Sequence, residues 1–591
     1  MTEDEIRRVF NRSENKNFKS GEIFFKQSDC SDSMFIILLG RVLIQVTKQD
    51  GEQQNLNVLN QGDHFGELSL LTGGTRTATA SAMIDTTVLE ISQTRFKRLI
   101  HEIPAFSINI SNTISAWLQT ELSGKPIHHK LGMIGFIHDQ TDTVTTSFSA
   151  QIIQFLTDKG KDIEIFTDRI AFWKQTKDNN NNIKQLHNIP SNFAPLKNTL
   201  ENTLVIVDIN IDTKANNVQL IAKLLNQCEH IWWLQLPQNN NTLDTLYHSL
   251  IQHQSTLSNK IQLTWLHGSS SSKLFQQEQS LELKHPDNYC QYDSNSQHIR
   301  QQDLTRFYHT IMGVQLGLAL GGGGARSLAH IGVLAALDEN NIVFDRIAGT
   351  SGGAIISVFY AAGFSLQLIL DLFKEEMTPP KWMRFIPYAS RWHLMSLFRF
   401  GLLEKRFRHY LKSHRLEQLL TPTHLVSADL ISGNEIIRST GNSVDSILES
   451  INHPLLGSPI YRDGLSLVDG GVLNNVPSSV LRRHKCDFVV SVDVGAKISE
   501  TFGRNCCDTP ENQMKKIGYL GTLNRVLEIR GNGLEKTYKN HSDFLIQPNG
   551  SEYPFDDFTH GKALFKIGYD AAMDVMPELK QRYADFVENK N

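Results

Sequence analysis

Three short motifs in the second half of the chain hold the residues best suited to nucleophilic catalysis. The most informative is Gly349-Thr350-Ser351-Gly352-Gly353, which lies between a strand-like run and an apolar helical run. In a strand, G-x-S-x-G, helix context the glycines relieve crowding in a sharp turn, and the serine hydroxyl projects into the open. The motif therefore predicts Ser351 as a nucleophile, on an elbow that Gly349 and Gly353 permit.

A glycine run upstream of the elbow is a candidate anion site. Gly321 to Gly324 follow the strand-like run 314–320 and open a helical run over 325–340. A dinucleotide fingerprint is excluded, because Arg326 or Ser327 stands where its third glycine belongs. Backbone amides at such a helix start can instead stabilise the oxyanion of a tetrahedral intermediate. We predict an oxyanion hole formed by Gly322, Gly323, Gly324 and Arg326.

A nucleophilic serine needs a base, and Asp469 is the strongest candidate. In Val468-Asp469-Gly470-Gly471 it closes an apolar run, so it should lie at a strand end with glycines leaving space beside it. The residues alone leave a second mechanism open, a Ser–His–Asp triad that uses His453 or His484.

Taken together, these motifs resemble the patatin-like phospholipase family. That family combines a glycine-rich oxyanion loop, a G-x-S-x-G serine and a D-G-G/A aspartate in a Ser–Asp dyad without histidine. The stretches 328–334, 428–430 and 474–477 also fit the family pattern, and the resemblance covers about 315–580. It implies an α/β hydrolase that cleaves lipid esters with Ser351 and Asp469, without a metal or other catalytic cofactor.

Two departures from the family pattern affect this expectation. Ser327 stands where the family usually has the last glycine of the oxyanion motif, and a serine fits there only if its φ is negative. Ser327 therefore raises an alternative, a cyclic-nucleotide sensor whose hydrolase module is inactive. Asn452 and His453 replace small or apolar residues and are expected to alter the pocket.

A second family resemblance lies near the N-terminus. In the string from Phe65 to Thr79, Glu67 and Arg76 are spaced to bind a sugar hydroxyl and a phosphate, although these two residues alone would also fit a surface loop. The whole string resembles the phosphate-binding cassette of cyclic-nucleotide-binding domains. That resemblance implies that Glu67 contacts the ribose 2′-OH and Arg76 the cyclic phosphate. The implied site for cAMP or cGMP is formed by Gly66, Glu67, Leu68, Ser69, Arg76 and Thr77.

Three regions must position these residues, so we expect a multidomain protein. Residues 8–125 read as a β-roll with flanking helices, including a helical pattern from about 96 to 122. Residues 130–300 alternate apolar strands with amphipathic helices, which predicts a parallel α/β sheet; they lack a G-x-x-x-x-G-K-[ST] motif, so no phosphoryl transfer is expected there. Residues 315–580 form the α/β hydrolase. This order resembles the neuropathy-target-esterase branch of lysophospholipases, which implies a phospholipid or lysophospholipid substrate and regulation by cyclic nucleotide.

Composition limits the partners and the location. The 591 residues carry a net charge of −4, which gives no general attraction to nucleic acid, and six cysteines are too few for a disulfide scaffold. With no signal peptide and no run of eighteen apolar residues, we expect a cytoplasmic protein. The oligomeric state cannot be read from the sequence.

One segment suggests a route to lipid. Residues 381–415 hold nine Lys or Arg, one acid and eight aromatic residues. Basic residues attract anionic headgroups and aromatic residues settle at the interface, which indicates peripheral attachment to the inner face of a membrane. A basic helical pair whose aromatic residues belong to the core is the alternative, and the sequence leaves both open.

Overall fold

The computed structural model of the chain describes most of each of the three regions. The described residues are 14–19, 22–39, 42–47, 53–59, 63–82, 86–103, 106–107, 133–139, 143–167, 182–185, 203–211, 218–228, 230–236, 247, 249–253, 257, 261–268, 288–383, 385–386, 389–495, 522, 525–526, 529 and 540–588. The later part of the helical pattern expected to end near 122 lies outside these residues, as does Arg384 of the basic segment.

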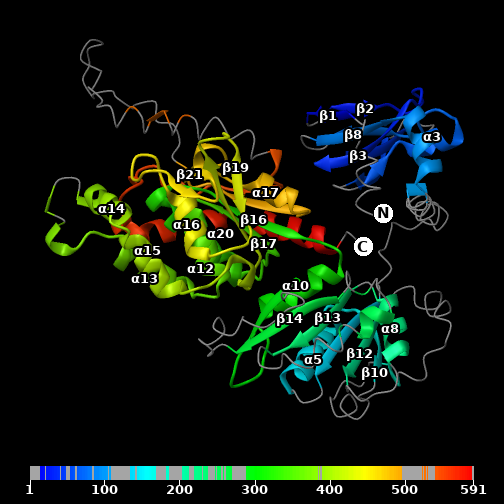
Figure 1. Cartoon of the computed structure of the whole chain (residues 1–591), viewed down its shortest axis with the longest axis horizontal. Coiled ribbons are helices and arrows are strands. Elements are labelled where there is room, and N and C mark those ends of the chain that lie inside the picture. Colours follow the sequence, from blue (N-terminus) through cyan, green and yellow to red (C-terminus); the bar gives the residue numbers. More distant parts are fainter. Residues whose placement is uncertain are drawn as a thin grey trace.

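The first region is a roll of two antiparallel sheets (Figure 1). One sheet has the order β1 (Glu14–Phe18), β8 (Thr86–Ser92), β3 (Ser33–Leu39) and β6 (His64–Phe65). The other has the order β2 (Ile23–Phe25), β7 (Thr79–Ala82), β4 (Val42–Thr47) and β5 (Gln53–Leu59). Buried aromatic side chains hold the roll together; the rings of Phe35 and Phe65, for example, stack 5.2 Å apart. Two helices follow strands of the first sheet, α2 (Glu67–Thr72) and α3 (Gln93–Glu102).

The middle region is a parallel sheet of seven strands, as its alternating pattern predicts. The order is β11 (Asn182–Gln185), β10 (Asp162–Thr167), β12 (Thr203–Ile211), β9 (Met133–Asp139), β13 (His230–Gln235), β14 (Ile261–Gly268) and β15 (Asn288–Tyr292). Each adjacent pair is parallel. The predicted amphipathic segments are α5 (Thr143–Asp158) and α8 (Val218–Gln227).

The third region is built on a mixed sheet of eight strands. Its main path is β20 (Ile460–Arg462), β21 (Leu465–Asp469), β18 (Thr423–Asp429), β17 (Arg346–Thr350), β16 (Leu316–Leu320), β22 (Phe488–Val492) and β23 (Phe544–Ile546), and β19 (Glu435–Arg438) pairs with β18. The strands from β18 to β23 along this path are parallel, whereas β21 and β19 run antiparallel to β18. The carboxyl ends of β16 and β17 therefore meet at one edge, where the glycine run and Ser351 follow.

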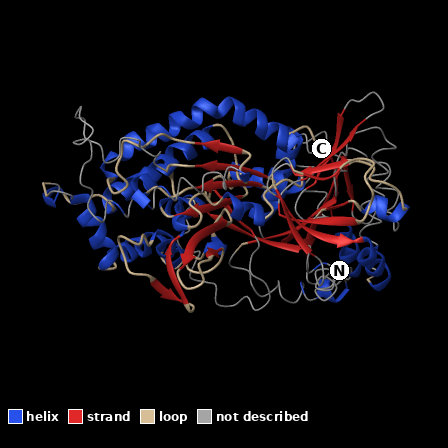
Figure 2. Cartoon of the chain, turned by 90° about the horizontal axis from the view of Figure 1, so that it is seen from above, coloured by secondary structure: helices blue, strands red, loops and turns tan. Residues whose placement is uncertain are grey.

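Helices lie on both sides of these strands (Figure 2). They are α10 (Gln301–Ile311), α11 (Ala329–Glu339), α12 (Gly352–Ala361), α13 (Leu366–Glu376), α14 (Ala389–Arg399), α15 (Leu402–Leu411), α16 (Ser443–Ile451), α17 (Ser478–Arg483) and α20 (Gly561–Glu588). The helices α11 and α12 are buried on nearly every side, which fits their apolar sequences. No helix among the described residues is both long and apolar enough to cross a bilayer.

The middle region packs against the hydrolase region through α10 (Figure 1). Phe307 of α10 lies edge-on to Trp232 of β13, with the ring centres 5.0 Å apart, and to Phe148 of α5 at 5.2 Å. Gln151 of α5 adds hydrogen bonds to the backbone of Gln297 and Ile299, just before α10. One apolar core therefore extends from the middle sheet into the hydrolase region.

Candidate functional site

The turn between β17 and α12 has the geometry of a nucleophile elbow. Ser351 has φ +54° and ψ −125°, a backbone conformation that L residues rarely adopt. A Cβ on Gly353 would overlap the Leu320 carbonyl of β16, and one on Gly349 would lie 2.5 Å from Ser357 Oγ. Both elbow glycines are thus required by close approach, and the turn leaves the serine hydroxyl beside the sheet edge.

Asp469 lies directly beside the elbow serine. Oγ of Ser351 donates a 2.6 Å hydrogen bond to Oδ2 of Asp469, and the N–H of Gly471 donates to Oδ1 at 2.8 Å. The antiparallel pairing of β21 with β18 brings Asp469 to this place, 118 residues away along the chain. The structure therefore brings the two predicted residues into contact, as a dyad requires.

Burial sets the electrostatics of Asp469, whose residue is only 4% exposed. Desolvation raises the pKa of this carboxyl, and the nearby His453, followed by the hydrogen bonds from Ser351 and Gly471, opposes that rise only in part. A raised pKa makes the carboxylate a stronger base than an ordinary aspartate.

Neither candidate histidine is placed as a triad base. All three side chains are described, and no hydrogen bond joins the imidazole of His453 to Ser351 or Asp469; its Nδ1 accepts the N–H of Leu455 at 3.3 Å. Burial lowers the pKa of His453, so its ring is neutral near pH 7. His484 stacks on His424, 3.8 Å between ring centres, near the amino ends of β17 and β18. That is the opposite edge of the sheet from Ser351, so the triad through His484 is wrong.

The glycine run adjoins the elbow, but only two of the four predicted oxyanion donors have an amide without an acceptor among the described residues. A Cβ on Gly322 would lie 3.0 Å from Cβ of Ser351, which shows how close the run comes to the nucleophile. The amide of Gly322, however, donates to the Asn475 carbonyl at 3.0 Å, and that of Arg326 donates to the Gly323 carbonyl at 3.2 Å. Their inclusion as oxyanion donors needs correction, because each N–H already has an acceptor. The amides of Gly323 and Gly324 have none among the described residues.

The conformation of the run requires glycine at Gly324 in particular. This residue has φ +59°, and a Cβ there would overlap the carbonyl oxygen of Phe555. That same carbonyl accepts the N–H of Ala325 at 2.6 Å, which ties the loop to the segment before α20. The positive φ and the close approach both exclude a side chain at this position.

Two polar residues that sequence reasoning left without a role hold the run in place. Asn475 accepts from Gly322 through its carbonyl and donates from Nδ2 to the Gly322 carbonyl at 3.2 Å. His330 donates from Nε2 to the Gly321 carbonyl at 2.7 Å, and burial lowers its pKa to about 4, so it is neutral. Both residues lie in stretches that match the family pattern, which was the only available signal of their importance.

Ser327 fits into the loop without strain. It lies within the 3₁₀ turn Gly324–Leu328, its φ is not positive, and its side chain is buried. Its Oγ packs against Gly352, the residue after the nucleophile, where a Cβ would collide with it. The condition set for a serine at this position, a negative φ, is therefore met.

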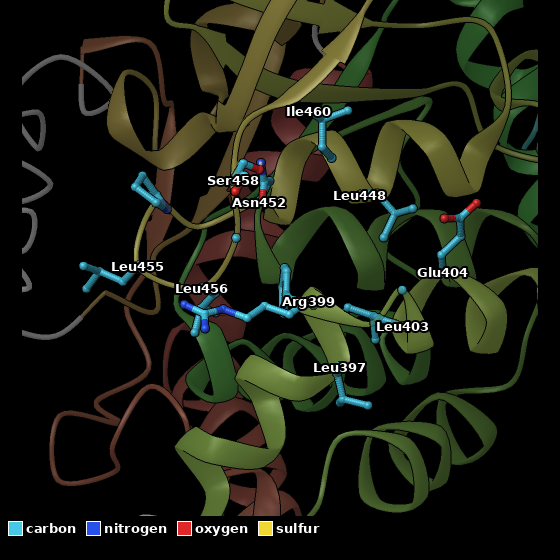
Figure 3. A pocket seen from close by; sticks show the side chains of 14 residues that line it. Leu397, Arg399, Leu403, Glu404, Leu448, Asn452, Leu455, Leu456, Ser458 and Ile460 are labelled. Atoms are coloured by element: carbon cyan, nitrogen blue, oxygen red, sulfur yellow. Dashed lines mark hydrogen bonds between the residues drawn. The ribbon is translucent and has the colours of Figure 1, made fainter.

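A pocket of about 660 Å³ lies between the loop 452–460 and the helices α14 and α15, and its lining residue Asn452 connects it to Asp469 (Figure 3). Asn452, on its wall, accepts the Asp469 N–H through its carbonyl at 3.0 Å and donates from Nδ2 to Leu467. Five leucines line part of the remainder, and Arg399 reaches across toward Leu456. The lining combines these leucines with Glu404, which pairs with Arg408, and with one exposed arginine that has no acidic partner among the described residues.

The basic segment 381–415 is divided between surface and core. Trp382, Phe385 and Phe400 are 71%, 90% and 76% exposed, whereas Phe407 is buried. Other exposed apolar side chains of the same part are Ile386, Trp392 and Leu402. Four of the basic residues form ion pairs, namely Arg391, Arg406, Arg408 and Arg415. In Figure 1 the helices α13, α14 and α15 gather at one side of the hydrolase region.

The N-terminal cassette brings its two charged residues together. Gly66, with φ +86°, turns the chain from β6 into α2, and Glu67 is fully buried at the start of that helix. Arg76 donates to the Gly66 carbonyl at 2.9 Å and to Ser69 Oγ at 3.4 Å, and its guanidinium lies 4.0 Å from the centre of the Phe25 ring. Burial lowers the pKa of Arg76, although nearby acids oppose this. Leu68 is half-buried and Thr77 is exposed.

Comparisons with known proteins agree with this division of the chain. The family model described as "Patatin-like phospholipase" matches residues 318–482, and that described as "Cyclic nucleotide-binding domain" matches residues 15–102. Among solved structures, the Thermus thermophilus catabolite activator protein is 26% identical and covers 20% of this chain and 57% of its own, with a TM-score of 0.20.

Curated relatives span larger parts of the chain. The neuropathy target esterase sws of Drosophila melanogaster is 21% identical over 81% of this chain and 36% of its own length. The lysophospholipase NTE1 of Candida albicans is 20% identical over 97% of this chain and 47% of its own. An uncharacterized NTE family protein of Mycobacterium tuberculosis is 35% identical over 31% of each. The chain thus spans less than half the length of each of these relatives.

Proposed function

We propose that this chain, which combines a cyclic nucleotide-binding domain with a patatin-like phospholipase domain, is a serine lipid acyl hydrolase that acts through a Ser–Asp dyad. The observation that carries the proposal is the 2.6 Å hydrogen bond from Ser351 to Asp469, made by a serine on a strained elbow. Strain at a non-glycine residue persists only where the surrounding structure enforces it, and it is concentrated at functional sites.

In the first step, Asp469 accepts the hydroxyl proton as Ser351 Oγ attacks the acyl carbonyl. The existing hydrogen bond already points this proton at Oδ2, so no rearrangement precedes the transfer. The raised pKa of Asp469 strengthens the base. The amides of Gly323 and Gly324 stabilise the oxyanion, and an oxyanion donor typically contributes about 2.7–4 kcal/mol. Asp469 then passes its proton to the leaving alcohol, and water attacks the acyl-enzyme to release the fatty acid.

The pocket that Asn452 connects to the dyad supports a phospholipid or lysophospholipid substrate. Its leucine-lined walls suit an acyl chain, and a chain there would lie next to the loop that carries Asn452 and, through it, Asp469. Arg399 at the same pocket offers an unpaired guanidinium, which binds phosphate oxygens well. We therefore assign a phosphate-bearing lipid to this pocket.

The exposed aromatic residues of the segment 381–415 support peripheral attachment to a membrane, which for a cytoplasmic protein is its inner face. Trp382, Phe385 and Phe400 are isolated from the core and belong to the same part of the chain as the pocket. Lys381 and Lys405 are unpaired basic residues there and would meet anionic headgroups. Attachment through this segment would bring the lipid to the pocket without a spanning helix.

The N-terminal domain is proposed to bind cAMP or cGMP and to regulate hydrolysis. The buried Glu67 has one carboxylate oxygen without a partner, as a ribose hydroxyl would require. Arg76 donates to Gly66 and Ser69 of the cassette, while its Nε has no partner among the described residues, and an incoming cyclic phosphate would accept from these donors. The alternative is a sensor with an inactive hydrolase, which Ser327 raised; the φ of Ser327 is not positive, so the backbone there does not favour this alternative.

The proposal is tested with a panel of lipids and both cyclic nucleotides. Wild type should release fatty acid from lysophospholipid, and Ser351→Ala should not. Arg76→Ala should abolish nucleotide binding in calorimetry, while Arg98→Ala, an exposed arginine of α3, should bind as wild type does. Equal hydrolysis by Ser351→Ala would overturn the assignment of the nucleophile.

A further inference from the structure

A second pocket, of about 390 Å³, lies at the other edge of the hydrolase sheet, where the middle region packs against it. Arg346 and His424, near the amino ends of β17 and β18, contribute to its floor, and Gln315 precedes β16 beside them. Trp232, Tyr289 and other residues of the middle region line it from the facing side. The pocket is therefore formed jointly by two parts of the chain, and it is separate from the dyad.

The strand register brings the polar side chains of this pocket onto one face. Gly317 pairs with Arg346, and Ala348 pairs with His424. Side chains alternate along a strand, so Arg346, two residues from Ala348, projects on the same face as His424. His484, after α17, then stacks on His424 with 3.8 Å between ring centres and 14° between the planes.

Within the described part of the chain, three buried polar atoms of this pocket have no hydrogen-bond partner. They are Nε of Arg346, Nε2 of His424 and Oε1 of Gln315. The other ring nitrogen of His424 is engaged, since Nδ1 lies 2.7 Å from Ser439 Oγ. Buried polar atoms are nearly always satisfied in folded proteins, so three of them around one cavity indicate a polar ligand. Two of the atoms can be donors and the third is an acceptor.

The charges of the pocket favour an anion. Each carboxylate in its wall is already paired, Asp303 with Arg300 and Arg306, Asp345 with His309, and Glu417 with Arg415. Arg346, by contrast, has no acidic partner among the described residues. Counted with the two arginines that pair with its wall, Arg300 and Arg415, the cavity has four arginines against three carboxylates, which leaves one surplus positive charge. Burial, together with smaller contributions from the nearby His484 and Arg346, lowers the pKa of His424 to about 3.

We propose that this pocket binds a phosphate monoester. The phosphate oxygens accept from Arg346 and from the imidazole N–H groups of His424 and His484, and a protonated phosphate oxygen donates to Oε1 of Gln315. The cavity has more than ten times the ~30 Å³ that one water molecule occupies in the liquid, which leaves room for an organic group. The aromatic side chains of Trp232, Tyr289 and Phe307 offer that group a packing surface.

A ligand here would contact both the middle region and the strand that carries the elbow. β17 begins at Arg346 and ends at Thr350, and Ser351 follows directly. Binding would thus stabilise the packing of the two regions at the far end of that strand. This inference does not depend on the proposed hydrolase activity, because binding is measured without turnover.

Calorimetric titration of the full chain with phenyl phosphate and with inorganic phosphate tests the site. We expect wild type to bind phenyl phosphate more tightly than inorganic phosphate. Arg346→Gln and His484→Ala should each weaken phenyl phosphate at least tenfold. The control is Lys374→Gln, an exposed basic residue of α13 that lines neither pocket and should bind as wild type does. The N-terminal domain is identical in wild type and in the three variants, so any binding of the ligands to that domain contributes equally to all four titrations.

Each other outcome counts against the proposal. No binding by wild type, or unchanged binding by both variants, would overturn the site itself. Equal affinity for the two ligands would show a site for free phosphate and overturn the monoester. If Arg346→Gln unfolds, Arg346→Lys replaces it; this variant keeps the charge and should bind with intermediate affinity. His484 is partly exposed, so His484→Ala remains an independent variant.

Discussion

The backbone N–H of Ser351 donates a 3.0 Å hydrogen bond to Oγ of Ser450, which in turn donates to the Val426 carbonyl at 2.6 Å. Ser450 belongs to α16 and Val426 to β18, so a helix and a strand together hold the strained turn. Ser351 is thereby fixed at two atoms, its amide by Ser450 and its Oγ by Asp469. A nucleophile fixed in this way needs little reorganisation before attack.

Asp469→Asn should abolish hydrolysis, because an amide cannot accept the serine proton. In wild type, kcat/KM should rise with pH through the raised pKa of Asp469, since only the carboxylate is a base. The pH profile of a soluble short-chain ester checks this. A profile that falls over the same range, or activity retained by the variant, would contradict the role of Asp469 as base.

The same substitution should make the fold more stable at neutral pH. The pKa of Asp469 is higher in the folded than in the unfolded chain, so the folded chain holds its proton more tightly. Stability from this group is complete below the unfolded value, about 3.9, and is lost as pH rises through the folded pKa. Asp469→Asn removes that loss. Its Tm should therefore exceed that of wild type near pH 8 and approach it near pH 4.

His453→Ala should retain most of the activity. The imidazole is neutral and makes its hydrogen bond with Leu455, not with the dyad, so its removal takes away packing against Phe555 and no proton acceptor. Steady-state kinetics beside Ser351→Ala checks this. A loss as complete as that of Ser351→Ala would restore the triad through His453.

Local patterns predicted the elements that carry the site. The glycine run, the elbow and Asp469 each follow a strand, and each was found at a strand end because apolar strands and glycine turns are encoded by neighbouring residues. The parallel middle sheet was predictable for the same reason. The contact between Ser351 and Asp469 was only implied by family resemblance, since it depends on β21 pairing with β18.

Tertiary contacts could not be predicted from spacing. The N–H of Gly322 donates to Asn475, 153 residues away along the chain, and the N–H of Ser351 donates to Ser450, 99 residues away. Both hydrogen bonds depend on the tertiary fold. The separation of the basic segment into exposed Trp382, in the turn Lys381–Met383, and buried Phe407, on α15, likewise depends on how each element packs against the core. A list of aromatic residues in the sequence does not contain that information.

Gly324→Ala should lower kcat by a factor on the order of 10² to 10³, the usual effect of losing an oxyanion donor. The new Cβ would overlap the Phe555 carbonyl and shift the amide of Gly324. Gly433→Ala is the matched control, because Gly433 has φ +72° with open space around it. Both variants bear the left-handed strain, and the overlap with Phe555 should lower the Tm of Gly324→Ala further. A fall in kcat only for Gly324→Ala assigns the effect to the oxyanion loop. Equal kcat in the two variants would contradict the assignment.

Arg399→Gln should raise KM for lysophosphatidylcholine by about tenfold or more, since a hydrogen bond to a charged group contributes about 1.5–3 kcal/mol. KM for a monoacylglycerol with the same acyl chain should not change, because that lipid has no phosphate. Lys405→Gln, an exposed basic residue of α15 that does not line the pocket, is the control. A rise for both lipids would mean that Arg399 shapes the pocket and does not bind phosphate.

The double substitution Trp382→Ser and Phe385→Ser should weaken binding to anionic vesicles by more than tenfold. Full burial of one large apolar side chain contributes about 1.5–3 kcal/mol, and these two are among the most exposed in the described part of the chain. Vesicle sedimentation measures the loss. Hydrolysis of a soluble short-chain ester should be unchanged, because neither residue contacts the dyad. Ile431→Ser removes an apolar side chain that is 70% exposed elsewhere and should bind vesicles normally.

Wild-type binding should also weaken with salt, since Lys381 and Lys405 contribute by charge. Binding that is indifferent to both salt and the double substitution would place the membrane contact outside this segment.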